Sequence, residues 1–279
     1  MAAKFPEITI DEINAEDQKR WLTHSVAFSR RNPTVVCGGA VLVLITVLTL
    51  IAPFVTSDPL SIDPILRLKR PSAEYWFGTD HLGRDIFSRT LYGGRISLLV
   101  GLGVAVFSTL AGLMIGLISG YSRPVDAVMM RIMDGLMAIP EILLAVTLVA
   151  ITGASIQNVI VAITIPEIPR VARLVRSVVL LIREEPYVEA AISVGTGIRK
   201  MLFRHILPNS LAPIIVSATM GIGGSILTAA ALGFLGLGAQ PPMPEWGVMV
   251  SDGVPFLRQA PHMVFFPGMA IMFTVLGFN

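Results

Sequence analysis

The sequence has few charged residues, and they are unevenly placed. They make up 14% of the 279 residues, whereas soluble domains carry about a quarter. Hydrophobic residues make up 53%, and the mean hydropathy is +0.73. Three stretches, 32–57, 96–122 and 206–244, contain no Asp, Glu, Lys or Arg. Because about 20 apolar residues suffice for a helix to cross the hydrocarbon core, we predict an all-α, polytopic membrane protein.

Other absences exclude whole classes of function. The lone cysteine, Cys37, allows neither an internal disulfide nor a cysteine-based metal site. No compact basic, aromatic-rich segment suggests nucleic-acid binding. Neither G-x-x-x-x-G-K-[ST] nor H-E-x-x-H occurs, and the four histidines are scattered, so nothing indicates ATP binding or an intramembrane enzyme. We therefore expect no cofactor bound by this chain.

Apolar segments predict six transmembrane helices. They lie near 33–55, 96–120, 128–152, 156–182, 212–232 and 263–278. Residues 1–32 would then form an N-terminal tail, 33–57 the first transmembrane helix, 58–94 a long loop, and 95–279 a core with five further helices. The last helix ends at Asn279 without a charged anchor, from which we expect that the protein continues beyond the chain given.

Basic residues indicate the orientation, because they are enriched on the cytoplasmic side. They gather before the first helix, after the second, and between the fourth and fifth, all on one side of a six-helix arrangement. The 58–94 loop conflicts with this count, since it carries five basic residues. We keep the N-terminus cytoplasmic on the strength of the other three regions, which makes the 58–94 loop an extracytoplasmic cap.

A polar interruption between the fourth and fifth helices predicts a helix–turn–helix outside the bilayer. Pro186 suits a first helical turn, and Tyr187, Ala191 and Val194 recur as an apolar stripe. Gly195 suits the left-handed residue that ends a helix. A second short helix, 198–205, would follow before Pro208 redirects the chain. An ordinary amphipathic loop on the lipid surface is the alternative.

This interruption resembles the EAA loop of ABC-importer permeases, Glu-Ala-Ala-x3-Gly-x9-Ile-x-Leu-Pro. The matching residues are Glu189, Ala190, Ala191, Gly195, Leu207 and Pro208. His205 replaces the isoleucine of the pattern, which is the one departure. The resemblance implies that loop 184–210, with Tyr187 at its start, couples this chain to a cytoplasmic ATPase. It also implies a second, homologous permease, two ATPases that use ATP and Mg, and an extracytoplasmic substrate-binding protein.

Further motifs resemble the dipeptide, oligopeptide and nickel permease group, in its C-type subunit. They lie at 77–85, 88–99, 230–238, 240–247 and 266–272. The resemblance implies a multi-pass protein of the bacterial inner membrane. Within the first motif, the charges of Asp80, Arg84 and Asp85 suggest a folded cap. That cap is either purely structural or a platform for the substrate-binding protein.

Two carboxylates fall near the middle of the predicted membrane segments. Glu141 and Glu167 each follow a proline, and ionisable groups inside a membrane are candidates for function because their burial is costly. We predict that at least one faces the translocation path and meets a cationic group of the substrate. An internal ion pair with Arg170 is the alternative. Gly221, Gly223 and Gly224 suggest close helix packing in the fifth helix, either within the chain or with a partner permease.

The leading interpretation is a permease subunit of an ATP-driven importer, not itself an enzyme. Dipeptides, oligopeptides, glutathione, opines and nickel chelates all remain open as substrates. An ion-gradient-driven secondary transporter is the alternative. Such proteins often show inverted repeats, and we find no convincing repeat in this sequence.

Overall fold

The computed structural model describes residues 31–279, and the regular elements in that range are helical. The predicted tail, 1–32, therefore lies almost wholly outside the described residues. The α-helices are α2 (Pro33–Val55), α3 (Ile86–Tyr121), α4 (Arg123–Met137), α5 (Glu141–Thr152), α6 (Ile156–Arg183), α7 (Pro186–Ser193), α8 (Ile198–Lys200), α9 (Leu207–Phe234), α10 (Trp246–Gly253) and α11 (His262–Phe278). Two 3-10 turns, η1 (Pro64–Leu66) and η3 (Val254–Phe256), and a π-helix, η2 (Met201–Ile206), join them.

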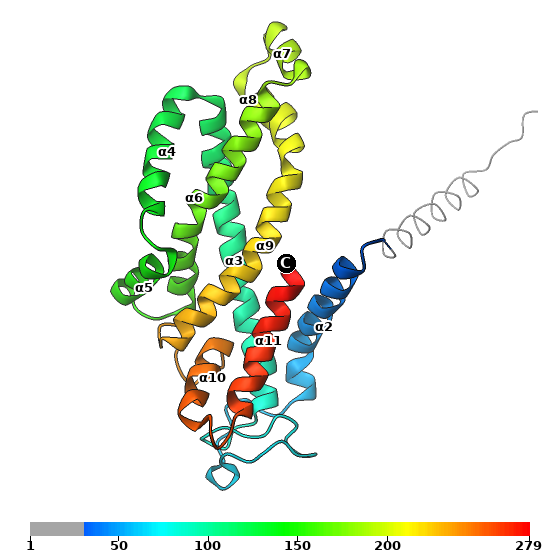
Figure 1. The fold of residues 1–279 in the computed structure, drawn as a ribbon, viewed down its shortest axis with the longest axis vertical. Coiled ribbons are helices and arrows are strands. Elements are labelled where there is room, and N and C mark those ends of the chain that lie inside the picture. The colour runs from blue at the N-terminus through cyan, green and yellow to red at the C-terminus, as the bar shows by residue number, and fades with distance from the viewer. Residues whose placement is uncertain (1–30) are drawn as a thin grey trace, which may run out of the picture.

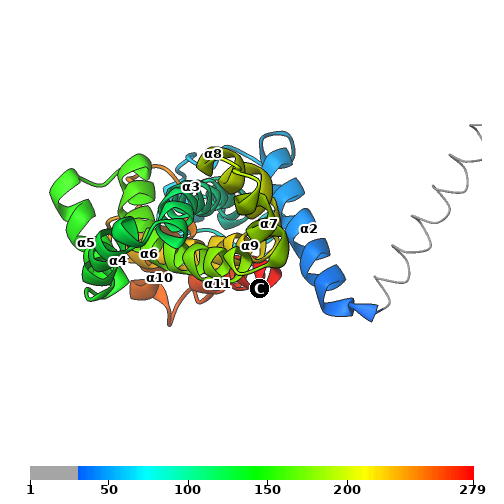
Figure 2. The same cartoon turned by 90° about the horizontal axis from the view of Figure 1, so that it is seen from above.

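Helices α3, α6 and α9 form the long axis of the molecule (Figure 1). The short helices α7 and α8 lie at one end of this axis, and α10 and the loop that follows α2 lie at the other. The last nine residues of the predicted 58–94 loop are helical, because α3 begins at Ile86. We call the remaining residues, 58–85, the cap, and residues 184–210 the EAA-like loop. Helix α2 lies at the side of the bundle, next to α11 (Figure 2). The two polar regions picked out from the sequence are thus at opposite ends.

Among residues 31–279, three helices are long and apolar enough to cross a membrane: α2, α3 and the continuous helix Ile198–Phe234. With 36 residues, α3 is about 54 Å long, well beyond the roughly 30 Å of a hydrocarbon core. Helices α4 and α5 together make a fourth candidate. The predicted segment 156–182 does form one helix, α6, but its charged residues set it apart from the other long helices.

Small residues allow α3 and α6 to pack closely. Gly112, Gly116 and Gly120 face α6 at intervals of one helical turn. A Cβ atom added at any of them would come within 2.5–2.7 Å of a valine Cβ atom. The valines are Val171, Val175 and Val179. Such a ridge of small residues lets two helices approach in a membrane, and here it aligns the helix that bears Glu167 and Arg170.

Two expectations about helix continuity are wrong. The predicted segment 128–152 is two helices, α4 and α5, bent by 85° at residues 138–140. Ion pairs from α6 hold α4 in place, because Arg176 binds Asp126 and Arg173 Nη2 lies 2.6 Å from Asp134 Oδ1. Pro140 accounts for the break, because a proline disfavours the helical conformation of the residue before it.

Pro208 does not redirect the chain. It stands in the first turn of α9, where a residue without an N–H is tolerated. The wider turns of the π-helix η2 carry the predicted second helix directly into α9. The EAA-like loop is therefore continuous with a membrane-length helix.

Candidate functional site

The turn of the EAA-like loop has the geometry predicted for it. Helix α7 begins with Pro186, and Gly195 adopts a φ of +77°, which confirms its left-handed conformation. The N–H of Gly195 donates to the carbonyl of Ile192 at 2.9 Å, and the N–H of Thr196 donates to that of Ala191 at 3.0 Å. These bonds satisfy carbonyls at the end of α7 and fix the angle at which the chain turns toward α8.

One face of this loop is buried against the bundle. Val188, Met201 and Ile206 are fully buried, and Ala191 is 9% exposed. They form one apolar cluster with side chains from α3, α6 and α9. Leu207 packs at the edge of the same cluster, whereas Pro208 is exposed. Apolar burial of this kind fastens the loop to the ends of the long helices.

The other face of the loop is apolar and uncovered. Its large side chains are exposed: Tyr187 (42%), Val194 (81%), Ile198 (60%) and Phe203 (65%). The predicted stripe is thus divided, since only Ala191 turns inward while Tyr187 and Val194 point outward. Glu189 and Ala190 are exposed as well. A concentration of exposed apolar side chains at a polar end of a protein marks an interaction surface; we call these four side chains the outer face of the loop.

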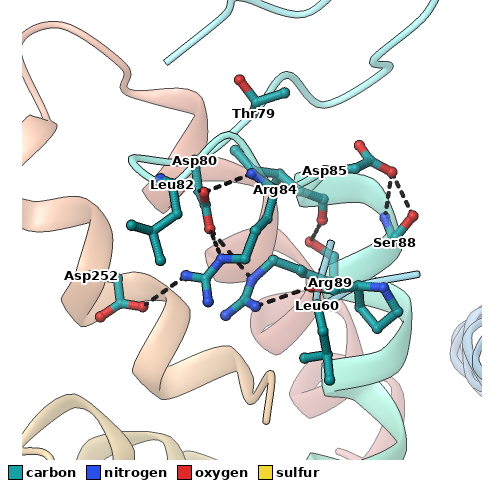
Figure 3. A network of polar contacts seen from close by, with 12 residues as sticks. Leu60, Thr79, Asp80, Leu82, Arg84, Asp85, Ser88, Arg89 and Asp252 are labelled. Atoms are coloured by element: carbon teal, nitrogen blue, oxygen red, sulfur yellow. Dashed lines mark hydrogen bonds and ion pairs between the residues drawn. The ribbon is translucent and has the colours of Figure 1, made fainter. Parts of the chain in front are cut away.

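At the opposite end, a buried ion-pair network holds the cap together (Figure 3). Asp80 Oδ2 lies 2.6 Å from Arg84 Nε and 3.7 Å from Arg89 Nε. Asp80 Oδ1 accepts hydrogen bonds from the backbone N–H groups of Leu82 and Arg84, at 2.8 and 2.9 Å. Arg84 also faces Asp252 of α10 at 3.9 Å. Because Asp80, Arg84 and Arg89 are each at most 6% exposed, loss of one charge would leave another unpaired in the interior.

Asp85 has a different structural task. Its carboxylate caps α3 by accepting hydrogen bonds from the N–H groups of Phe87 and Ser88, at 3.2 and 3.0 Å. Asp80, Arg84 and Asp85 therefore serve the cap itself. The structural interpretation is favoured for these three side chains, while the cap exposes others, notably Ile65 (87%) and Trp76 (62%).

Two buried polar side chains at the start of α10, Glu245 and Trp246, were not predicted as site residues from the sequence. Glu245 is 4% exposed, and its Oε2 accepts a hydrogen bond from the N–H of Ala239 at 3.1 Å. Burial raises the pKa of Glu245 to about 7, against the opposing effect of backbone N–H groups. A Cβ atom on Gly233 or Gly238 would collide with this carboxylate. Trp246, 1% exposed, donates through Nε1 to the carbonyl of Thr90 at 2.8 Å.

Between the two ends, Glu141, Glu167 and Arg170 come together. Arg170 lies 3.2 Å from Glu141 and 3.3 Å from Glu167, which confirms the internal ion pair. Glu167 is 7% exposed, whereas the Arg170 side chain is 61% exposed. With both carboxylates ionised, the three groups carry one net negative charge. Within residues 31–279, no group of three or more His, Cys, Asp or Glu side chains is placed to hold a metal ion.

Glu167 and Arg170 also line a cavity of about 800 Å³ that is otherwise formed mainly by α9, and we call it the central cavity. Gly221 and Gly224 belong to its wall, and the Cβ position of Gly221 lies 3.9 Å from Glu167 Oε1. Gly223 instead packs against the end of α11, beside Phe278. The small residues of α9 therefore serve both packing within the chain and the cavity.

Known proteins resemble the chain over nearly its whole length. The family described as "binding-protein-dependent transport system inner membrane component" matches residues 109–279. A probable peptide ABC transporter permease of Sinorhizobium fredii is 49% identical, over 95% of this chain and 91% of its own length. A dipeptide transport system permease of Alkalihalophilus pseudofirmus is 50% identical (90% and 83%). A glutathione transport system permease of Pectobacterium atrosepticum is 44% identical (100% and 92%).

The family match covers both the EAA-like loop and the central cavity, and the relatives extend it to the cap and α2. The motifs that resemble the C-type permeases thus lie within the part of the chain that is similar to these relatives. The chain belongs to the family of inner membrane components of binding-protein-dependent transport systems and is a permease subunit of an ABC importer.

Proposed function

We propose that the outer face of the EAA-like loop is where a cytoplasmic ATPase docks and drives transport. The observation that carries the proposal is the position of that face. Val194 and Phe203 are exposed, yet the loop is anchored by buried Val188 and Met201 and continues into α9. A rigid connection of this kind suits the transmission of a push from the ATPase into the membrane.

In this proposal six segments cross the membrane, with the N-terminus and the EAA-like loop in the cytoplasm. Four of the six segments are α2, α3, α9 and α11. The other two are the bent pair α4–α5 and the charged helix α6. Two ATPases supply ATP hydrolysis with Mg, a second permease completes the pathway, and an extracytoplasmic binding protein delivers substrate to the cap. This chain binds no cofactor and catalyses no reaction itself.

The central cavity is the part of the translocation path that this subunit contributes. Glu167 and Arg170 form its polar wall, and α9 forms its apolar wall. The net negative charge of the group that includes Glu141 suits the amino group of a peptide. Since relatives carry the names of peptide, dipeptide and glutathione permeases, we propose a short peptide or glutathione-like substrate.

The test is a charge reversal at each end of the molecule. Glu189→Arg changes an exposed residue of α7, and Glu74→Arg changes an exposed residue of the cap. Neither side chain is buried, so both variants should assemble with the partner permease. We expect Glu189→Arg to lose the ATPase on co-purification and to abolish ATP-coupled uptake in proteoliposomes, whereas Glu74→Arg retains the ATPase.

Two results would overturn the proposal. If Glu189→Arg bound the ATPase and transported as well as the native protein, the docking face would lie elsewhere. If uptake needed an ion gradient and no ATPase, a secondary transporter would be the better account. Gly195→Arg, which strains a left-handed turn, should reproduce the loss caused by Glu189→Arg.

A further inference from the structure

A second cavity, of about 480 Å³, lies where the cap meets the first turn of α11. Arg70 of the cap and Arg258, which follows η3, both line it, together with Gln259. No Asp or Glu is among its lining residues. Two guanidinium groups at one cavity repel each other unless an anion lies between them. The charge of this cavity therefore favours an anionic ligand.

Arg70 and Arg258 differ from the two arginines of the buried ion-pair network. Arg84 and Arg89 are buried and paired with Asp80, whereas Arg70 and Arg258 are exposed. Within residues 31–279, neither Arg70 nor Arg258 takes part in an ion pair. Their forked donors remain available for a phosphate group, which guanidinium binds well.

The backbone on both sides of the cavity is held in place. Next to Arg70, the N–H of Lys69 donates to Thr79 Oγ1 at 2.9 Å, and the N–H of Thr79 donates to the Lys69 carbonyl at 3.0 Å. Next to Arg258, the N–H of Gln259 donates to the carbonyl of Phe256 at 2.9 Å. The cavity is thus formed before any ligand arrives, which lowers the entropy cost of binding.

The rest of the lining is apolar. Phe266 is stacked on Phe77 of the cap at a ring distance of 3.8 Å, while Phe265 is 56% exposed. Both belong to α11, an apolar helix that begins at this cavity. A ligand seated here would meet positive charge at the cap and an apolar surface along α11. A phospholipid at the surface of a bilayer has this combination of properties.

We propose that the cavity binds the headgroup of an anionic phospholipid in the leaflet on the cap side. Arg70 and Arg258 contact the phosphate, and an acyl chain lies along Phe265. Basic cavities next to membrane helices bind anionic headgroups in the same way. The lipid would fasten the cap to α11 beside the membrane. This inference rests on the membrane placement of α11 in the proposed function.

The test compares lipid retention by the purified complex of both permeases. Native protein, the double variant Arg70→Gln/Arg258→Gln, and Lys69→Gln are extracted from bilayers of phosphatidylglycerol and phosphatidylcholine, and the bound lipid is counted by native mass spectrometry. Lys69 is a matched control, because it is exposed and adjacent to Arg70 but does not line the cavity. We expect the double variant to retain at least about tenfold less phosphatidylglycerol, and Lys69→Gln to retain the native amount.

Three outcomes would overturn the inference: equal retention in all proteins, an equal loss in Lys69→Gln, or displacement of the lipid by excess inorganic phosphate. Preserved lipid retention in the double variant, with weaker binding of the extracytoplasmic binding protein, would assign the cavity to that partner and reject the lipid. ATP-coupled uptake by the native complex is measured in parallel. Uptake without arginine-dependent lipid retention rejects the inference alone, whereas lack of ATP-coupled uptake rejects the proposed function.

Discussion

The two ends of the molecule are stabilised by different kinds of interaction. At the cap, the charges of Asp80, Arg84 and Arg89 are buried and satisfied within the chain. The EAA-like loop is stabilised instead by burial of apolar side chains such as Val188 and Met201. The polar network of the cap is therefore completed by Arg89 of α3 and Asp252 of α10, within the chain itself.

The EAA-like loop, by contrast, has a buried inner face and an exposed apolar outer face. Val194, at the end of α7, and Phe203, near the start of the membrane-length helix Ile198–Phe234, remain uncovered. Such apolar exposure is costly in water and is compensated when a partner covers it. The two ends should therefore respond to mutation in different ways: mutations of the cap should lower stability, and mutations of the outer face of the loop should lower transport.

The largest loss of stability is expected at the cap. Asp80→Asn removes the negative charge that Arg84 and Arg89 share in the interior. Breaking a buried ion pair costs about 3–5 kcal/mol, so the thermal unfolding temperature of the purified protein should fall sharply. Glu74→Gln, an exposed change in the same segment, should leave it unchanged. Equal unfolding temperatures for the two variants would show that the network does not stabilise the cap.

At the EAA-like loop, a mutation on the inner face should lower stability, whereas a mutation on the outer face should lower transport alone. Met201→Ala deletes a fully buried side chain and should cost about 2–5 kcal/mol. Phe203→Ala removes an exposed one and should change the free energy of unfolding by less than about 0.5 kcal/mol. Only the Phe203 variant should lower ATP-coupled uptake while retaining native stability. Native uptake by that variant would remove Phe203 from the docking face.

Between the ends, the central carboxylates should affect transport more than stability. Glu141→Gln and Glu167→Gln each leave Arg170 one carboxylate partner and cancel the net negative charge of the group. We expect uptake of a short peptide to fall by about tenfold, the effect of roughly 1.4 kcal/mol. The ATPase should still co-purify with both variants. Unchanged uptake would exclude these carboxylates from the translocation path.

A pH dependence of stability is expected on the cap side. Since the pKa of Glu245 is raised from 4.5 to about 7, the folded protein holds a proton that the unfolded chain releases. The resulting stabilisation is complete below about pH 4.5 and is lost as the pH rises through about 7. Compared with Glu245→Gln, which stays neutral, the native protein should lose unfolding temperature over this range. A pH-independent difference between the two proteins would contradict this assignment.

Local rules predicted the elements that depend on nearby residues. The ends of α2 follow from an uncharged apolar run behind Pro33, and the turn at Gly195 follows from the need for a positive φ. The ion pair between Glu167 and Arg170 was foreseeable because the two residues are one helical turn apart.

Features that depend on distant residues could not be predicted in this way. The position of α4 against α6 relies on Arg176 meeting Asp126, fifty positions away in the sequence. The burial of Glu245 depends on close approach to Gly233 and Gly238, which is a property of the folded loop. Likewise, the burial of Asp80 makes it a structural residue, although its sequence context equally allowed a surface role.

Photo-crosslinking of the assembled transporter can show which end of this subunit touches the ATPase. A photoreactive residue is placed at Val194 on the outer face of the loop, at buried Val188 as its control, or at Trp76 on the cap. We expect that the ATPase is captured from position 194 and from neither of the others. Capture of the ATPase from position 76, or failure to capture it from position 194 in a complex that transports, would contradict the account.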